Sequence, residues 1–132
     1  MQAPRIFAVI TSVAMFAFWA IAAAASGETA TITPRELSER IAAGRAPLIL
    51  DVRTPEEYAA GHLPGARNIP HDALANRVGE LALAKSDEVI VHCHSGRRAA
   101  AAEQVLRDAG YTNVRDLEGH WQGWRGAGFP TE

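Results

Sequence analysis

The sequence is poor in cysteine and in lysine: its 132 residues include one of each, Cys93 and Lys85. A single thiol excludes a disulfide within the chain. The other basic residues are all arginines, and they are scattered instead of clustered. Nucleic-acid binding needs clustered positive charge, so we expect no nucleic-acid partner. The histidines and the cysteine show none of the spacings of a metal site, and we expect no metal.

The first 25 residues differ in composition from the rest. One arginine, Arg5, precedes an uncharged stretch over residues 6–25 that ends in small side chains. This layout, with an Ala-x-Ala site at Ala23 and Ala25, is typical of a cleaved secretory signal. A run of about 20 apolar residues can also span a bilayer, so a retained membrane anchor is the alternative. Either interpretation places the rest of the chain outside the cytoplasm, and we expect the bacterial periplasm.

Residues 26–132 are long enough for a single domain with a modest core. An exposed thiol in an exported domain is open to oxidation, so the presence of Cys93 indicates a chemical role. The alternative is a buried cysteine that acts as a small apolar side chain. The loop around Cys93 favours the chemical role.

Short apolar runs alternate with helical patterns through this region. Capping signatures at Thr33 and Thr54 indicate two helix starts. Strands are predicted over residues 29–33, 48–52, 66–69, 88–92 and 114–117. Helices are predicted from residue 34 to Gly44 and over residues 56–60, 72–83 and 98–109, followed by an ordered coil with a helical turn over 119–130. This alternation predicts an α/β domain with a parallel sheet and helices on both faces.

The site of such a sheet lies where its parallel strands end. Asp51 and Arg53 follow one buried strand, and the loop of residues 93–98 follows another. This loop carries Cys93 directly before a predicted helix, and Gly96 lets the loop curl tightly. Backbone N–H groups at the positive end of a helix stabilise a thiolate. The pattern therefore predicts a nucleophilic cysteine.

Three segments of the sequence, in order, resemble the signatures of the rhodanese family. They are residues 51–58 running into 61–66, the loop Cys-His-Ser-Gly-Arg-Arg at 93–98, and residues 117–121 continuing through Trp124 to 128–130. Together they extend over residues 33–130. The resemblance implies a single rhodanese-like domain with a mainly parallel sheet of about five strands and helices on both faces.

The chemistry that the resemblance implies is transfer of sulfane sulfur. Cys93 would attack a donor such as thiosulfate or a persulfide, carry the sulfur as a persulfide, and pass it to a thiol or to cyanide. No cofactor is then needed beyond the covalent sulfur, and the partners are these small molecules. We expect a monomer, in contact with a membrane only if residues 6–25 are retained.

Individual residues of the site also have expected roles. Arg97 is expected at the rim of the site, and Arg98 inside it, paired with Asp51. His94 and Ser95 stand where relatives often carry basic residues, which favours a low-molecular-weight persulfide as an alternative donor. Substrate binding is expected from His94, Ser95, Gly96, Arg97, Arg98 and Arg53, and structural support from Asp51.

Several side chains keep an alternative interpretation. Arg98 either braces the loop or polarises the donor, and Arg53 faces either the pocket or the short helix beside it. His94 either contacts the substrate or shuttles protons. Trp121 and Trp124 are expected to pack in the core or to rim the pocket.

Two other functions remain open. Related phosphatases and arsenate reductases carry one residue more between the cysteine and the arginine, whereas four residues separate Cys93 from Arg98. We expect the shorter loop to be too narrow for phosphate, because a cradle needs its donors about 3 Å from the charge. The second alternative is a non-catalytic module that binds a partner or senses oxidants through its thiol.

Overall fold

The computed structural model describes residues 29–132, and the predicted signal or anchor over residues 1–25 lies outside the described residues. Within this range no helix combines the length and apolar character needed to cross a membrane. The strands are β1 (Ala30–Ile32), β2 (Leu48–Asp51), β3 (Arg67–Asn68), β4 (Val89–His92) and β5 (Val114–Leu117). The helices are α1 (Pro34–Ala42), α2 (Pro55–Ala59), α3 (Leu74–Arg77), α4 (Arg97–Asp108) and α5 (His120–Gly126), with a 3₁₀ turn η1 at Val78–Leu81.

The five strands form one sheet in the order β1-β5-β4-β2-β3, and every pairing is parallel. This confirms the predicted sheet. From β2 the chain moves outward to β3 and then returns to form β4 on the other side of β2. The order of the strands therefore reverses between β2 and β4, which is where ligands bind in open α/β sheets. Asp51 pairs with His92 at the ends of these two strands, so the segments that follow them start side by side.

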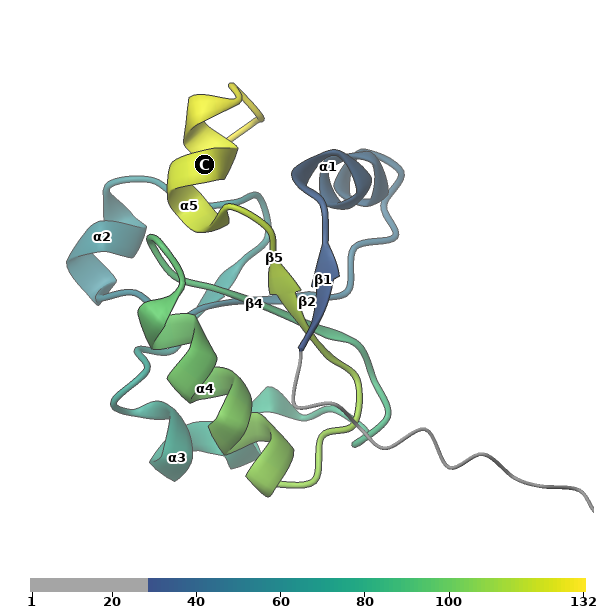
Figure 1. The fold of residues 1–132 in the computed structure, drawn as a ribbon, viewed down its shortest axis with the longest axis vertical. Coiled ribbons are helices and arrows are strands. Elements are labelled where there is room, and N and C mark those ends of the chain that lie inside the picture. The colour runs from purple at the N-terminus through teal and green to yellow at the C-terminus, as the bar shows by residue number, and fades with distance from the viewer. Residues whose placement is uncertain (1–28) are drawn as a thin grey trace, which may run out of the picture.

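Helices cover both faces of the sheet, as Figure 1 shows. Ile49 and Ile90 pack in a buried cluster with side chains of α1 and α5. Leu50 and Val91, their neighbours along the strands, pack in a second cluster with side chains of α3 and α4. Successive side chains of a strand point to opposite faces, so β2 and β4 are buried on both sides.

Local sequence explains the helix starts. The Thr33 side chain accepts a hydrogen bond from the Glu36 N–H at 3.1 Å. Thr54 and Glu57 form a complete capping box at the start of α2. In α4 the side chains of Ala99, Ala102 and Leu106 are buried at helical spacing, which places one face of this alanine-rich helix on the sheet.

Two segments differ from the sequence-based prediction. Residues 72–83 are not one loose helix but α3 followed by η1, which ends at Ala82 in a left-handed conformation. The tail, expected to be mostly coil, forms the seven-residue helix α5. Its glycines disfavour a helix, but burial of Trp121 and Trp124 against the sheet overrides that weak local preference.

We predict that Leu106→Ala lowers the free energy of unfolding by about 2–5 kcal/mol, because the buried leucine leaves a cavity under α4. Gln104→Ala, on the exposed side of the same helix, should change it by no more than about 0.5 kcal/mol. Urea unfolding of both variants checks this. Equal changes in the free energy of unfolding for the two variants would show that Leu106 does not pack in the core.

Candidate active site

The loop after β4 brings backbone N–H groups to the thiol. Gly96, with φ +123°, ends the loop, and α4 begins at the next residue. The Gly96 N–H donates to the Cys93 Sγ at 3.0 Å. No side chain caps the start of α4 in the described structure, so its first-turn N–H groups remain for an anion. One amide of the predicted cradle, that of Gly96, is therefore directed at the sulfur.

The thiol itself is buried, which corrects the expectation of an exposed cysteine. Cys93 is 1% exposed and contacts the core cluster that includes Leu50, Val91 and Ala99. The reason is that β4 continues directly into Cys93, so the residue stays at the level of the sheet. Burial alone fits a structural cysteine as well, but the N–H aimed at Sγ is a feature that apolar packing does not require.

The last helix holds the backbone of the loop. The Trp121 N–H donates to the Cys93 carbonyl at 3.0 Å, and the Gln122 N–H donates to the His94 carbonyl at 3.1 Å. In the opposite direction, the Cys93 N–H donates to the His120 Nδ1 at 3.3 Å. Both backbone groups of Cys93 are thus bonded to the start of α5.

Arg98 pairs with Glu57 and not with Asp51 as we expected. Two hydrogen bonds, of 2.7 and 3.0 Å, join its guanidinium to the Glu57 carboxylate. The hydrogen bond from Arg98 is the main cause that lowers the pKa of Glu57 to about 2. Arg98 lies in the first turn of α4, where its side chain reaches Glu57 of α2. Asp51 is instead the last residue of β2, within the sheet. Arg98 therefore braces the loop, but against a different carboxylate.

Asp51 is the partner of Arg53. Nη2 of Arg53 lies 2.6 Å from Oδ2 of Asp51 and donates to the Gly61 carbonyl at 2.8 Å. The guanidinium also stacks over Trp121, 4.4 Å from the ring centroid. Arg53 is only 2% exposed and Asp51 is fully buried. Arg53 is therefore not available to bind substrate, which corrects that expectation, and Asp51 supports the site through Arg53.

His92, the last residue of β4, adds a contact beneath the loop. Its Nδ1 lies 3.1 Å from the Cys93 carbonyl and donates to it. Burial lowers the pKa of His92, so the ring stays neutral at neutral pH. The Cys93 carbonyl thus accepts two hydrogen bonds, one from the His92 ring and one from the Trp121 N–H.

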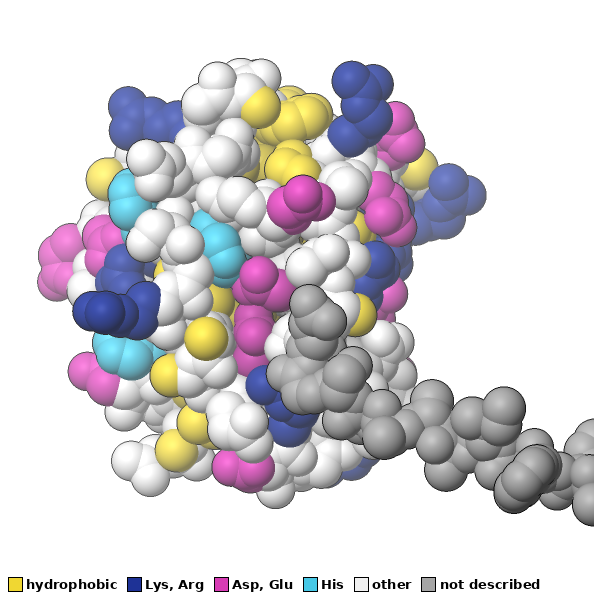
Figure 2. All heavy atoms as spheres, viewed as in Figure 1, with side chains coloured by type: hydrophobic (Ala, Val, Ile, Leu, Met, Phe, Trp, Pro, Cys, Tyr) yellow, Lys and Arg dark blue, Asp and Glu magenta, His cyan; other side chains and the backbone are white. Residues whose placement is uncertain are grey.

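The remaining loop side chains lie at the surface. His94, Ser95 and Arg97 are exposed, in agreement with the expected position of Arg97 at the rim. On the face seen in Figure 2, histidine and arginine side chains gather on the side that carries α2 and the start of α4. Among residues 29–132, no three His, Cys, Asp or Glu side chains are grouped closely enough to hold a metal ion.

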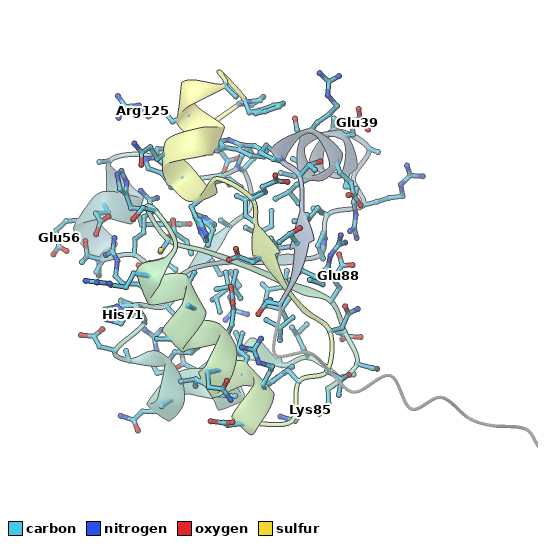
Figure 3. All side chains as sticks on the ribbon, in the orientation of Figure 1. Glu39, Glu56, His71, Lys85, Glu88 and Arg125 are labelled. Atoms are coloured by element: carbon cyan, nitrogen blue, oxygen red, sulfur yellow. The ribbon has the colours of Figure 1, made fainter. Side chains whose placement is uncertain are left out.

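A pocket of about 280 Å³ lies between α2, α5 and the C-terminal segment. Trp121 was expected in the core or at a pocket rim, and it is nearly buried while lining this pocket. Arg125 projects from α5 toward solvent (Figure 3). The pocket adjoins the loop through Glu57, which binds Arg98. Its lining residues are Glu57, Ala60, Gly61, Trp121, Arg125 and Thr131.

Three polar side chains, of which His120 and Glu103 are buried and Asp116 is partly exposed, connect the loop with the middle of α4. His120, which accepts from the Cys93 N–H, places its Nε2 3.3 Å from the Asp116 Oδ2. Asp116 in turn adjoins Glu103, which is buried on α4. Burial, together with the neighbouring Asp116, raises the pKa of Glu103 to about 8. Glu103 is therefore protonated at neutral pH.

Sequence reasoning did not identify Glu57 and His120 as parts of the site. Glu57 was interpreted as part of the capping box at the start of α2, and it has that role in the structure as well. His120 belongs to the third signature segment, and its position between Gly119 and Trp121 gave no direct sign of a contact with Cys93. The useful signal would have been that Glu57 lies in the helix after β2 and His120 begins the helix after β5, the two strands that flank β4.

Comparison with known proteins agrees with this geometry. The family model of the rhodanese-like domain matches residues 33–127. The chain belongs to the rhodanese-like domain family. The predicted resemblance and the α/β fold that it implied are thus confirmed.

Several relatives of this rhodanese-like domain carry names of sulfurtransferases. It is 39% identical over 98 residues to thiosulfate sulfurtransferase 16 of Arabidopsis thaliana, a match that covers 63% of this chain and 78% of that protein. It is 39% identical over 70 residues to thiosulfate sulfurtransferase PspE of Escherichia coli, covering 53% of this chain and 67% of PspE. The structure of the human single-domain sulfurtransferase TSTD1 superimposes with a TM-score of 0.65 at 32% identity, covering 75% of this chain and 97% of TSTD1.

We predict that Asp51→Asn lowers the free energy of unfolding by about 3–5 kcal/mol, because it leaves the buried Arg53 charge without its anionic partner. Glu57→Gln is the control: it breaks an ion pair that is partly exposed, worth about 0–1 kcal/mol. Chemical denaturation at neutral pH measures both. A loss for Asp51→Asn as small as that for Glu57→Gln would contradict the structural role of the buried pair.

A second prediction concerns Glu103, whose pKa is raised to about 8 in the folded protein. The carboxyl of an unfolded chain titrates near pH 4.3, so between about pH 4.3 and 8 the folded state binds the extra proton. The stability contributed by protonated Glu103 is therefore complete at low pH and is lost as pH rises through this window. In Glu103→Gln the free energy of unfolding should fall less steeply with pH across this window. Unfolding measured at intervals across the window checks it, and an unchanged slope in the variant would refute it.

Proposed function

We propose that this rhodanese-like domain is a sulfurtransferase that carries sulfane sulfur on Cys93. One observation carries the proposal: the Gly96 N–H points at the Cys93 Sγ at the uncapped start of α4. Relatives named as sulfurtransferases support the same class of reaction. A thiolate is the reactive form of cysteine, and backbone N–H groups stabilise it without a cofactor or a metal.

In the first half-reaction the Cys93 thiolate attacks the outer sulfur of the donor. With thiosulfate, a new bond forms between Sγ and that sulfur, while the sulfur–sulfur bond of the donor breaks and sulfite leaves with the electron pair. The product is a persulfide whose outer sulfur is anionic. The amides of Gly96 and of the first turn of α4 stabilise this charge, because they are fixed before the reaction begins.

In the second half-reaction an acceptor thiolate or cyanide attacks the outer sulfur. The bond to Sγ breaks, its electron pair returns to Cys93, and the thiolate is restored. No outside oxidant or reductant is consumed. The pocket lined by Glu57 and Trp121 is the proposed place for the acceptor, because Glu57 bonds to Arg98 and the Trp121 N–H bonds to the Cys93 carbonyl.

The charges around the loop bear on which donor is used. Arg98 is neutralised by Glu57, and Arg53 by Asp51. This leaves Arg97 as the loop arginine at the surface without such a carboxylate partner in the described structure. One exposed arginine is a weak attraction for a dianion such as thiosulfate. We therefore propose a low-molecular-weight persulfide as a donor beside thiosulfate.

The cellular location of the domain is proposed from its amino-terminal sequence. Residues 1–25 have the layout of a secretory signal or membrane anchor, which favours a periplasmic domain. The domain is proposed to act as a monomer on small molecules. Detection of the processed protein in a periplasmic fraction tests this location.

We predict that purified protein incubated with thiosulfate or a low-molecular-weight persulfide gains the mass of one sulfur atom, and that Cys93→Ser gains none. Only a thiol nucleophile can hold the sulfur covalently. Intact-mass spectrometry measures the gain, and added cyanide should remove it as thiocyanate. An aryl phosphate assayed in parallel should not be hydrolysed. Phosphate release without any sulfur loading would identify a phosphatase instead, and oxidation of Cys93 without sulfur transfer would identify a thiol sensor.

A further inference from the structure

His120 has a backbone conformation that its residue type disfavours. Its φ is +53°, and within residues 29–132 the other non-glycine residue with a positive φ is Ala82, at the end of η1. Left-handed φ values strain residues that have a Cβ, so glycine or asparagine is the usual occupant. Strained residues cluster at functional sites, where the surrounding contacts hold them in place.

Each hydrogen bond of the His120 ring has a defined direction. The Cys93 N–H can only donate, so the Nδ1 that receives it at 3.3 Å carries no proton. The proton of the neutral ring is then on Nε2, which lies 3.3 Å from the Asp116 Oδ2. Burial acts to raise the pKa of Asp116, but hydrogen bonds from His120 and Glu103 outweigh it and lower that pKa overall. Asp116 is thus an anionic acceptor that fixes this tautomer.

The same ring also lies against Gly96. A Cβ built on Gly96 would come within 3.0 Å of the His120 Nε2 and 3.3 Å of its Cδ2. The imidazole therefore contacts the loop at two points: the amide of Cys93 and the backbone of the residue whose N–H points at Sγ. His120 is 7% exposed, so solvent has little access to these contacts.

We propose that His120 is a positioning residue for sulfur transfer, an inference that rests on the proposed function of Cys93. Its neutral imidazole, oriented by Asp116, holds the Cys93 amide and supports Gly96. This keeps the Gly96 N–H directed at the sulfur through both half-reactions. The strained φ is retained because it places the ring between Asp116 and the loop.

Three substitutions separate this role from a merely structural one. His120→Asn places an amide oxygen near the position of Nδ1, and asparagine tolerates a left-handed φ. His120→Ala removes the acceptor and keeps the strain, whereas His120→Gly removes the acceptor and relieves it. Alanine and glycine should therefore differ in stability but share the same functional defect. Thermal unfolding of each variant gives the stability.

The first measurement is independent of sulfur chemistry. Nitrogen-15 NMR of the wild-type protein should show His120 with its proton on Nε2, and hydrogen exchange should show a protected Cys93 amide. The Cys93 amide should exchange faster in His120→Ala and His120→Gly and remain protected in His120→Asn. A proton on Nδ1, or unchanged exchange in the glycine variant, would overturn the proposal.

The second measurement is the kinetics of persulfide formation from thiosulfate. We expect kcat to fall about 10- to 100-fold in His120→Ala and His120→Gly with little change in KM, because displacement of a reacting group by about 1 Å has effects of this size. His120→Asn should recover most of the rate. Rates that follow stability, with glycine faster than alanine, would overturn the positioning role.

The two measurements also separate this inference from the proposed function. If wild-type protein forms no persulfide with any donor, the sulfurtransferase proposal fails, while the NMR and exchange results still decide whether His120 holds the Cys93 amide. If wild-type protein forms the persulfide and all three variants form it at the wild-type rate, the proposed function stands and the role of His120 is refuted.

Discussion

The hydrogen bond from the Gly96 N–H to the Cys93 Sγ is the contact on which the site depends. It requires a tight turn, because only two residues, His94 and Ser95, separate its two partners along the chain. β4 fixes one end of the turn and α4 the other, while α5 bonds to the backbone between them. The parallel sheet makes this possible by ending β2, β4 and β5 at one edge, where the following segments meet.

Positive charge near the thiol is largely neutralised by carboxylates. Arg53 is buried with Asp51 under the site, and Arg98 is joined to Glu57 at its side. Both arginines act as braces between segments that follow different strands. Backbone N–H groups are therefore left as the main partners of a negatively charged sulfur. Amides fixed by the fold stabilise such a charge without reorganising during the reaction.

Much of this arrangement follows from local sequence patterns, and the remainder depends on tertiary contacts. The apolar runs that became β2 and β4, and the Gly-containing loop after Cys93, already predicted a parallel sheet with a thiol at its edge. The partner of Arg98 was not predictable, because it depends on α2 facing the start of α4. The roles of α5 and His120 were missed for a related reason: a glycine-rich segment becomes helical only when its tryptophans pack on the sheet.

The most direct test is a crystal structure of the protein after reaction with thiosulfate, with anomalous scattering used to locate sulfur. We predict an added sulfur bonded to the Cys93 Sγ and lying about 3 Å from N–H groups of the loop and the first turn of α4. An added sulfur directed into the core cluster beside Leu50 and Val91, out of reach of these amides, would contradict the central role of the cradle. So would sulfur bound at any other residue.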